Sequence, residues 1–253
     1  MISCLTVTQE GRLDVLALAV SDFRGQSATE KELVVVHDGG EGFDDAVQKL
    51  VSGAADASAR VTRVPPGRTL GALRNLAVDE ARGEYVCQWD DDDRYHPRRL
   101  EAQLDALLSA KADCSFLADQ LHLFAPMREM YWDDWHEEPY PLDFAPGTLF
   151  GRRNLLARYP DLARGEDSAL CIEMLREGRT FARMRGQGWL YVYRFDGRNS
   201  FDQVHHASIS HWRRFRGAWL LRHEAELRAR LAEYSPPLGP FVMPHEGGRL
   251  QFD

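Results

Sequence analysis

Four consecutive aspartates, Asp90–Asp93, follow an apolar run in the stretch EYVCQWDDDDRYHP. Neighbouring carboxylates repel one another, so the cluster needs a positive partner, and Mg²⁺ and Mn²⁺ prefer such oxygen ligands. Alternate residues at the end of a strand project to one side, which places Asp90 and Asp92 to share a divalent cation. We therefore expect a cation that bridges these aspartates to the phosphate oxygens of a ligand. The competing interpretation is a solvated acidic turn after a strand.

The aspartates close a series of alternating strands and helices. Short apolar runs predict strands at residues 2–8, 32–37, 59–65 and 84–89, and helical spacing of apolar residues predicts helices at 11–25, 43–54 and 69–83. Such alternation implies right-handed crossovers and an open, twisted, mostly parallel sheet flanked by helices. Ligands of these sheets bind outside the carboxyl ends of the strands, where the aspartates lie.

Beyond Pro97, which opens another helix at 97–111, the alternation loosens. The patterns predict strands at 113–124 and 128–135, as a mixed-sheet pair, and at 188–195. They predict helices at 148–159 and 166–178, and a long amphipathic helix at 209–234. The tail at 235–248 is rich in Pro and Gly, so we expect it to be extended over the surface or mobile. No linker divides the chain.

The composition of the chain argues against several classes of protein. A net charge of −8 and a pI near 5.6 argue against a nucleic-acid binder. No stretch approaches the ~18 apolar residues of a membrane span, and the N-terminal stretch is too short and polar for a signal peptide. The four cysteines are far apart in apolar surroundings, which is typical of reduced core thiols. We expect a cytoplasmic protein, at the inner face of the membrane if its acceptor is lipid-linked.

Several motifs, in their order and spacing, resemble family 2 glycosyltransferases of the GT-A fold. They are VVVHDGG, GALRNLAVDEARGEYVCQWDDDDRYHP, GTLFGRR and GEDSALCIEML, and the likeness covers about residues 1–200. The resemblance implies one GT-A domain over residues 1–253. Its parts would be a nucleotide-binding half (about 1–95), an acceptor half (about 96–200) and a C-terminal helix and tail (about 201–253). It further implies that the protein transfers a sugar from a nucleotide sugar, expected to be a UDP-sugar, to an acceptor hydroxyl with inversion, in bacterial glycan or glycolipid synthesis.

The resemblance assigns the family's D-x-D signature to Asp90, Asp91 and Asp92. Asp92 would bind Mn²⁺ or Mg²⁺ directly, while Asp90 would hold the ribose or a metal-bound water, and Asp91 would belong to the donor site. A third ligand, usually a His after the last strand, has no obvious position. We favour His205 over Asp196 and His206, although such a His is more often an ordinary surface or core residue.

Four further residues match the nucleotide side of the family. Thr6 and Thr8 would line the base pocket, and Asp38 would accept the ring N–H of uracil. Arg74 would lie near the base and phosphates. Taken alone, Asp38 is a good turn former and Arg74 fits an exposed helical position equally well.

On the acceptor side, Asp167 matches the general base that an inverting transfer needs, with Glu166 beside it. Acids in the first turn of a helix also complement its dipole without any chemistry. Gly147 would let the backbone approach the sugar. Trp132 and Trp135 would stack on the acceptor sugar or, alternatively, cap the core.

Other interpretations remain open. A non-catalytic scaffold could retain this fold, whereas a sugar nucleotidyltransferase would need a glycine-rich loop after the first strand, which TVTQEGRLD lacks. The family's processive members carry Q-x-x-R-W and membrane helices, while this chain has only HWRRF, so we expect transfer of one sugar. The arginines and aromatic residues of the C-terminal helix could contact a membrane surface that carries a lipid-linked acceptor. Packing on the domain or on a partner in a homodimer is the alternative.

Overall fold

The strands form two sheets in the part of the chain that the computed structural model describes, which is residues 1–52, 58–136, 142–214, 218–245 and 247–253. The first sheet has the strand order β10-β6-β9-β4-β1-β2-β3. Its strands are β1 (Ile2–Thr8), β2 (Lys31–His37), β3 (Ala59–Arg63), β4 (Tyr85–Gln88), β6 (Cys114–Leu117), β9 (Phe150–Arg152) and β10 (Phe181–Met184). All neighbours pair in parallel except β9, which is antiparallel to β4 and β6. The expectation of a mostly parallel sheet flanked by helices is confirmed.

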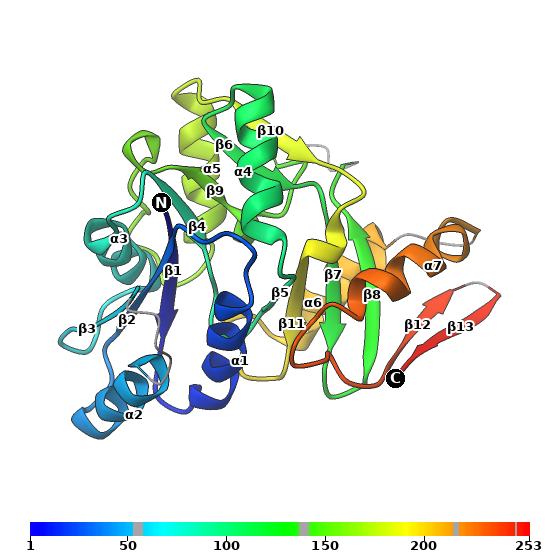
Figure 1. Cartoon of the computed structure of the whole chain (residues 1–253), viewed down its shortest axis with the longest axis horizontal. Helices are drawn as coiled ribbons and strands as arrows, with labels where there is room; N and C mark the ends of the chain where they lie inside the picture. The colour runs from blue at the N-terminus through cyan, green and yellow to red at the C-terminus, as the bar shows by residue number, and fades with distance from the viewer. Residues whose placement is uncertain (53–57, 137–141, 215–217, 246) are drawn as a thin grey trace.

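Helices cover both faces of this sheet (Figure 1). They are α1 (Leu13–Arg24), α2 (Glu41–Ser52), α3 (Leu70–Glu80), α4 (Arg99–Ala110) and α5 (Glu166–Arg176). Side chains alternate along a strand, so β2 sends Leu33 and Val35 into the core with α1, α2 and α4, and Val34 and Val36 into the core under α3. This two-sided burial explains the continuous apolar run of β2.

The second sheet has the order β13-β12-β8-β7-β11-β5. Its strands are β5 (Arg94–Tyr95), β7 (Asp119–Phe124), β8 (Glu129–Asp134), β11 (Tyr191–Phe195), β12 (Phe241–His245) and β13 (Gly248–Phe252). The predicted pair of strands is confirmed in part. The second half of the strand predicted at 113–124 is β7, which forms an antiparallel hairpin with β8, whereas the first half is β6 of the first sheet. Helix α6 (Gln203–Arg213) packs on β8.

Further segments differ from the sequence prediction. Residues 181–184, for which no element was predicted, form β10 beside β6. Residues 148–159 contain β9 and a single turn at Arg153–Leu155 instead of a helix, because β9 fills the space between β4 and β6. The single long helix predicted at 209–234 is instead two helices. Helix α6 ends at Arg213, because the backbone of Arg214 is extended, and α7 runs over Ala218–Leu231. The tail predicted to be extended or mobile contributes the hairpin β12–β13, and Val242 N–H donates to the Arg128 carbonyl beside β8 (2.9 Å).

The apolar face of α7 is covered by the protein itself. Leu220, Leu227 and Leu231 are buried in the main core. The packing alternative is therefore correct for α7, while contact with a membrane or a partner copy stays a prediction. Among the described residues, none of the helices combines the length and the apolar character that crossing a membrane would require. All four cysteines are buried free thiols, as predicted.

Candidate active site

A cavity of about 610 Å³ opens at the carboxyl ends of β1, β2 and β4. Of the residues predicted from the sequence, eleven line it: Thr8, Asp38, Arg74, Asp90, Asp91, Asp92, Trp135, Gly147, Glu166, Asp167 and His205. They come from strand ends, from α3, from the turn Pro146–Thr148, from the start of α5 and from α6, so segments far apart in the sequence meet here. Thr6 and Trp132 are not among the lining residues.

Thr6 does not reach the cavity. Its side chain is fully buried, and its hydroxyl donates to the carbonyl of Trp89 at 2.7 Å. That bond ties β1 to the residue directly before the aspartate cluster. The prediction that Thr6 lines a base pocket is therefore wrong, whereas Thr8, two residues later at the end of β1, does line the cavity.

The two tryptophans that were predicted to contact the acceptor, Trp132 and Trp135, lie in different environments. Trp132 is only 4% exposed and lies in the core, with its ring edge-to-face against Trp219 at 4.8 Å. It lies two residues after buried Met130 on the same face of β8, so it faces inward, and its predicted contact with an acceptor is wrong. Trp135 lies just beyond the end of β8 and lines the cavity, with the Arg213 guanidinium 4.2 Å from its ring centre.

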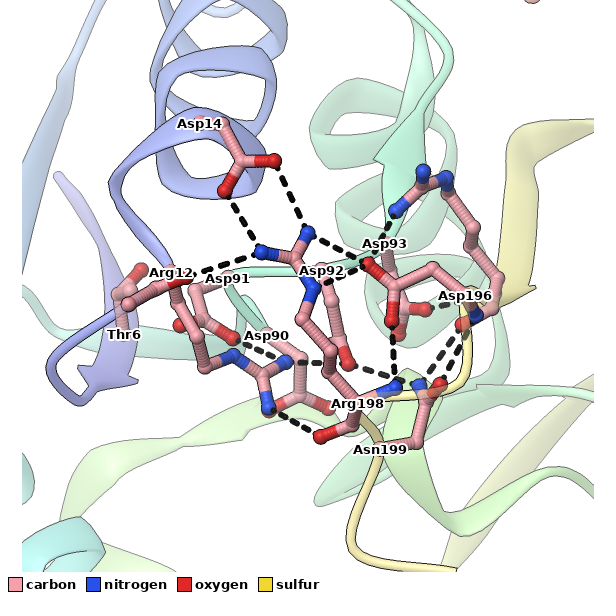
Figure 2. A network of polar contacts seen from close by, with 12 residues as sticks. Thr6, Arg12, Asp14, Asp90, Asp91, Asp92, Asp93, Asp196, Arg198 and Asn199 are labelled. Carbon is pink, nitrogen blue, oxygen red and sulfur yellow. Dashed lines mark hydrogen bonds and ion pairs between the residues drawn. The ribbon is translucent and has the colours of Figure 1, made fainter. Parts of the chain in front are cut away.

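Three of the aspartates are held by side chains from other segments, as Figure 2 shows in part. Asp90 lies 2.8 Å from Arg74 Nη1 and accepts from the Gln88 amide at 2.9 Å. Asp91 lies 2.8 Å from Arg12 Nη2, and Asp92 contacts the same guanidinium. The cluster therefore contacts a guanidinium on each side.

The fourth carboxylate, Asp93, is held by hydrogen bonds from β11 of the second sheet. Asp93 accepts hydrogen bonds from the Tyr191 hydroxyl and from the backbone N–H of Arg194. Burial, together with the charge of Asp92, raises the pKa of Asp93 well above its usual range. The same two causes raise the pKa of Asp91 to about 7, although Arg12 opposes them. Two arginines thus do not fully offset four carboxylates, and the protonated forms of Asp91 and Asp93 are favoured.

The donor set fits a Mg²⁺ or Mn²⁺ ion. Asp90 and Asp92 bring hard carboxylate oxygens to the cavity, and these ions take few protein ligands besides water and phosphate oxygens. The described residues contain no group of three His, Cys, Asp or Glu side chains arranged to hold a metal. His205 lines the cavity but its ring stacks on Phe201 at 4.1 Å, so the predicted third ligand is not gathered with the aspartates.

Arg74 joins the two acidic motifs. It extends from α3, and its Nε donates to Glu166 Oε1 at 2.8 Å while Nη1 reaches Asp90. Arg74 is 7% and Glu166 2% exposed, so this is a buried ion pair rather than the exposed helical arginine of the alternative interpretation. Gly71 makes the position of α3 possible, because a Cβ there would lie 1.9 Å from the carbonyl oxygen of Pro160.

Asp167 is the carboxylate that is suited to accept a proton. It lines the cavity at the start of α5 and takes part in none of the ion pairs found among the described residues. Burial, followed by the charge of Glu166, raises the pKa of Asp167 to about 6, and Arg74 partly opposes the shift. A general base works best when its pKa lies near the working pH.

A buried polar chain that the sequence analysis missed fixes α6 on the second sheet. Asp133 Oδ2 lies 3.0 Å from both His122 Nδ1 and the Ser210 hydroxyl, His122 Nε2 lies 3.0 Å from His206 Nδ1, and the Tyr193 hydroxyl lies 3.4 Å from His206 Nε2. One assignment of protons satisfies these four contacts, and the Ser210 hydroxyl also lies 2.9 Å from His122 Nδ1. Tyr193 donates to His206, His206 to His122, and both His122 and Ser210 to Asp133. Burial and His122 lower the pKa of His206 to about 3, in agreement with a neutral His206 ring. No motif marks these residues in the sequence.

The fold and family agree with known glycosyltransferases. TarS from S. aureus superposes with a TM-score of 0.60 at 17% identity, over 82% of this chain and 42% of TarS. Its 1–349 fragment in complex with UDP-GlcNAc gives 0.58 at 16% identity, over 80% of this chain and 60% of the fragment. Mannosyltransferase PcManGT from Pyrobaculum calidifontis, in complex with GDP-Man and Mn²⁺, superposes with a TM-score of 0.60 at 14% identity. The match covers 94% of this chain and 65% of PcManGT. The overall architecture is the GT-A fold.

Sequence comparison gives the family itself. The succinoglycan biosynthesis protein ExoO of Rhizobium meliloti (strain 1021) is 29% identical over 99 residues, which are 39% of this chain and 28% of ExoO. This chain thus matches less than a third of the length of that relative. Residues 4–141, more than half of the chain, match the family described as Glycosyl transferase family 2. The chain belongs to glycosyltransferase family 2.

Proposed function

We propose that the protein transfers one sugar from a nucleoside diphosphate sugar to an acceptor hydroxyl, with inversion at the anomeric carbon. One observation carries the proposal: Arg74 links Asp90 of the aspartate cluster to Glu166, the neighbour of Asp167, so the predicted donor site and the predicted base face one cavity. A regulatory scaffold would have no need for a base with a pKa of about 6 beside that cluster.

Asp92, with Asp90, would hold the divalent cation. When bound, the cation supplies positive charge that stabilises the leaving diphosphate. Asp167 takes the proton of the acceptor hydroxyl as its oxygen attacks the anomeric carbon in line. Glu166 holds its place through Arg74 and acts as a positioning residue. A single displacement of this kind inverts the configuration.

The nucleotide is proposed to be UDP. Asp38 lies at the edge of the cavity, where it accepts from the backbone N–H of Gly67 at 3.2 Å, and its second oxygen can accept from a uracil ring N–H. Structures of TarS with UDP and of PcManGT with GDP-Man and Mn²⁺ support a nucleotide-sugar donor and a metal without deciding the base. Trp135 and Gly147, which line the same cavity, are proposed to contact a carbohydrate or lipid-linked glycan acceptor. The buried free thiols suit the cytoplasm.

A nucleotide panel tests the donor site. We expect UDP to raise the melting temperature more with Mn²⁺ or Mg²⁺ than with EDTA, since a ligand that binds only the folded state stabilises it. Asp92→Asn should remove that difference, and Asp38→Asn should weaken UDP binding with and without metal. Equal stabilisation by UDP in metal and in EDTA would refute the metal site, and a preference for GDP would refute the role of Asp38. Release of UDP from a UDP-sugar with acceptor present separates an enzyme from a scaffold.

A further inference from the structure

Arg12 occupies the place where the sequence predicts a cation. It precedes α1 directly, and its Nη2 lies 2.8 Å from Asp91 and also contacts Asp92 (Figure 2). The side chain is nearly buried, so water screens this ion pair weakly. A guanidinium is always charged and presents a planar fork that binds carboxylates and phosphates alike.

A loop that follows β11 holds this arrangement together. Arg198 binds both oxygens of Asp14 at 2.9 Å and donates to the Gly11 carbonyl at 2.9 Å, so it clamps the segment that carries Arg12. Arg12 Nη1 in turn donates to the Arg198 carbonyl at 3.4 Å. The next residue, Asn199, donates to Asp92 at 2.8 Å. Arg12 and Asp92 are therefore both fixed by one loop, as Figure 2 shows.

Arg12 and a divalent ion would compete for the same carboxylate, that of Asp92. Asp92 Oδ2 contacts the Arg12 guanidinium and accepts a hydrogen bond from the Asn199 amide, so both of its lone pairs are already used in the absence of an ion. Two cations within a few ångströms of each other also repel strongly in a buried site. A metal can use Asp92 fully only if the guanidinium moves to another anion.

We propose that Arg12 is a built-in counter-cation, which neutralises Asp91 and Asp92 in the ligand-free enzyme and moves to the donor's diphosphate when a divalent ion binds. Metal and nucleotide then bind together, because the diphosphate gives Arg12 a new partner. This inference rests on the proposed metal site at Asp92. It assigns Arg12 a role in binding that no motif of the sequence indicates.

The test measures Mn²⁺ binding by electron paramagnetic resonance, without turnover. In wild type we expect UDP to raise Mn²⁺ affinity at least ~10-fold, equivalent to ~1.4 kcal/mol, while uridine, which lacks phosphates, should not. Arg12→Gln without nucleotide should already bind Mn²⁺ at least ~10-fold more tightly than wild type. Arg12→Lys keeps the charge and should stay near wild type.

Arg164→Gln is the matched control. Arg164 lines the same cavity but contacts the Ser200 carbonyl and the Phe201 ring instead of the aspartates. An equal gain in Mn²⁺ affinity for Arg164→Gln would overturn the proposal, because removal of any positive charge from the cavity would then raise the affinity. Unchanged affinity in Arg12→Gln would overturn it as well. If Arg12→Gln does not fold, an equal effect of uridine and UDP on wild type refutes the coupling. If no protein binds Mn²⁺ even with UDP, the metal site itself fails and the inference falls with it.

Discussion

The pH dependence of transfer should report the ionisation of Asp167, and Glu166→Gln should move it. Burial and the charge of Glu166 raise the pKa of Asp167 to about 6, and a base acts only when ionised. At saturating substrates the rate should therefore fall below pH 6, to about one-tenth of its plateau at pH 5.

The size of the shift follows from the charges. Two unit charges some 6 Å apart interact by ~2–3 kcal/mol at an effective dielectric of 20. Glu166 is already paired with Arg74, which cancels part of that repulsion at Asp167. We expect Glu166→Gln to lower the pKa of Asp167, and with it the acid limb, by about one unit, or ~1.4 kcal/mol. Arg74→Met should move the limb in the opposite direction, because Arg74 lowers that pKa.

The assay is release of nucleoside diphosphate at saturating donor and acceptor between pH 4.5 and 8.5, with donor affinity measured over the same range as a control. Asp167→Asn should flatten the acid limb and reduce the rate by about 10²- to 10⁴-fold. An acid limb that stays in place in Glu166→Gln, or moves to higher pH, would refute this account of the base. Near-full turnover by Asp167→Asn would direct the search to Glu166.

Three further outcomes are expected. Asp167→Asn should raise the free energy of unfolding at pH 7 but not at pH 3.5, measured by urea denaturation. The pKa of Asp167 is higher in the folded than in the unfolded chain, so its ionisation lowers the free energy of unfolding as pH rises from about 4 to 6. Asn cannot ionise and removes that loss of stability. Equal stability of the two proteins at pH 7 would contradict the prediction. Trp132→Ala should lose about 3–5 kcal/mol of stability, whereas Trp135→Ala should fold normally and raise the acceptor KM; the reverse pattern would exchange their roles. Gly71→Ala should lower stability by about 1–3 kcal/mol, because its Cβ must displace the Pro160 carbonyl; an unchanged melting temperature would show that α3 can shift freely.

Strands β1 to β4 of the first sheet could be predicted because their signals are local and repeat. Each of these four apolar runs became a parallel strand, and β2 is the clearest case. Residues 148–159 carry helical spacing, yet Phe150–Arg152 pairs with β4 and β6, so tertiary pairing overrode local propensity. The hairpin β12–β13 was missed because prolines and glycines in residues 235–248 mask a short strand.

The candidate site could be predicted where a residue lies at a strand end or a helix start. Asp90 and Asp167 meet in one cavity as the motifs predicted. Thr6 failed although the bounds of β1 were predicted correctly, because it lies one strand period deeper than Thr8 and its hydroxyl is used by the Trp89 carbonyl. Trp132 failed because the sequence does not show which face of the predicted strand is covered, and the face of β8 that carries Trp132 packs into the core.

Arg12 and its clamp lie beyond sequence reasoning for a different reason. The contacts between Arg12 and Asp92 and between Arg198 and Asp14 join the start of α1 to segments far away in the sequence, so nothing local specifies them. Yet they follow from the feature that is plain in the sequence. Four adjacent carboxylates at the end of a buried strand cannot remain without cations, and in the described residues the guanidinium groups of Arg12 and Arg74 contact them. The requirement for positive charge was thus predictable, whereas the identity of the residue that supplies it before any metal arrives depends on how the loops close.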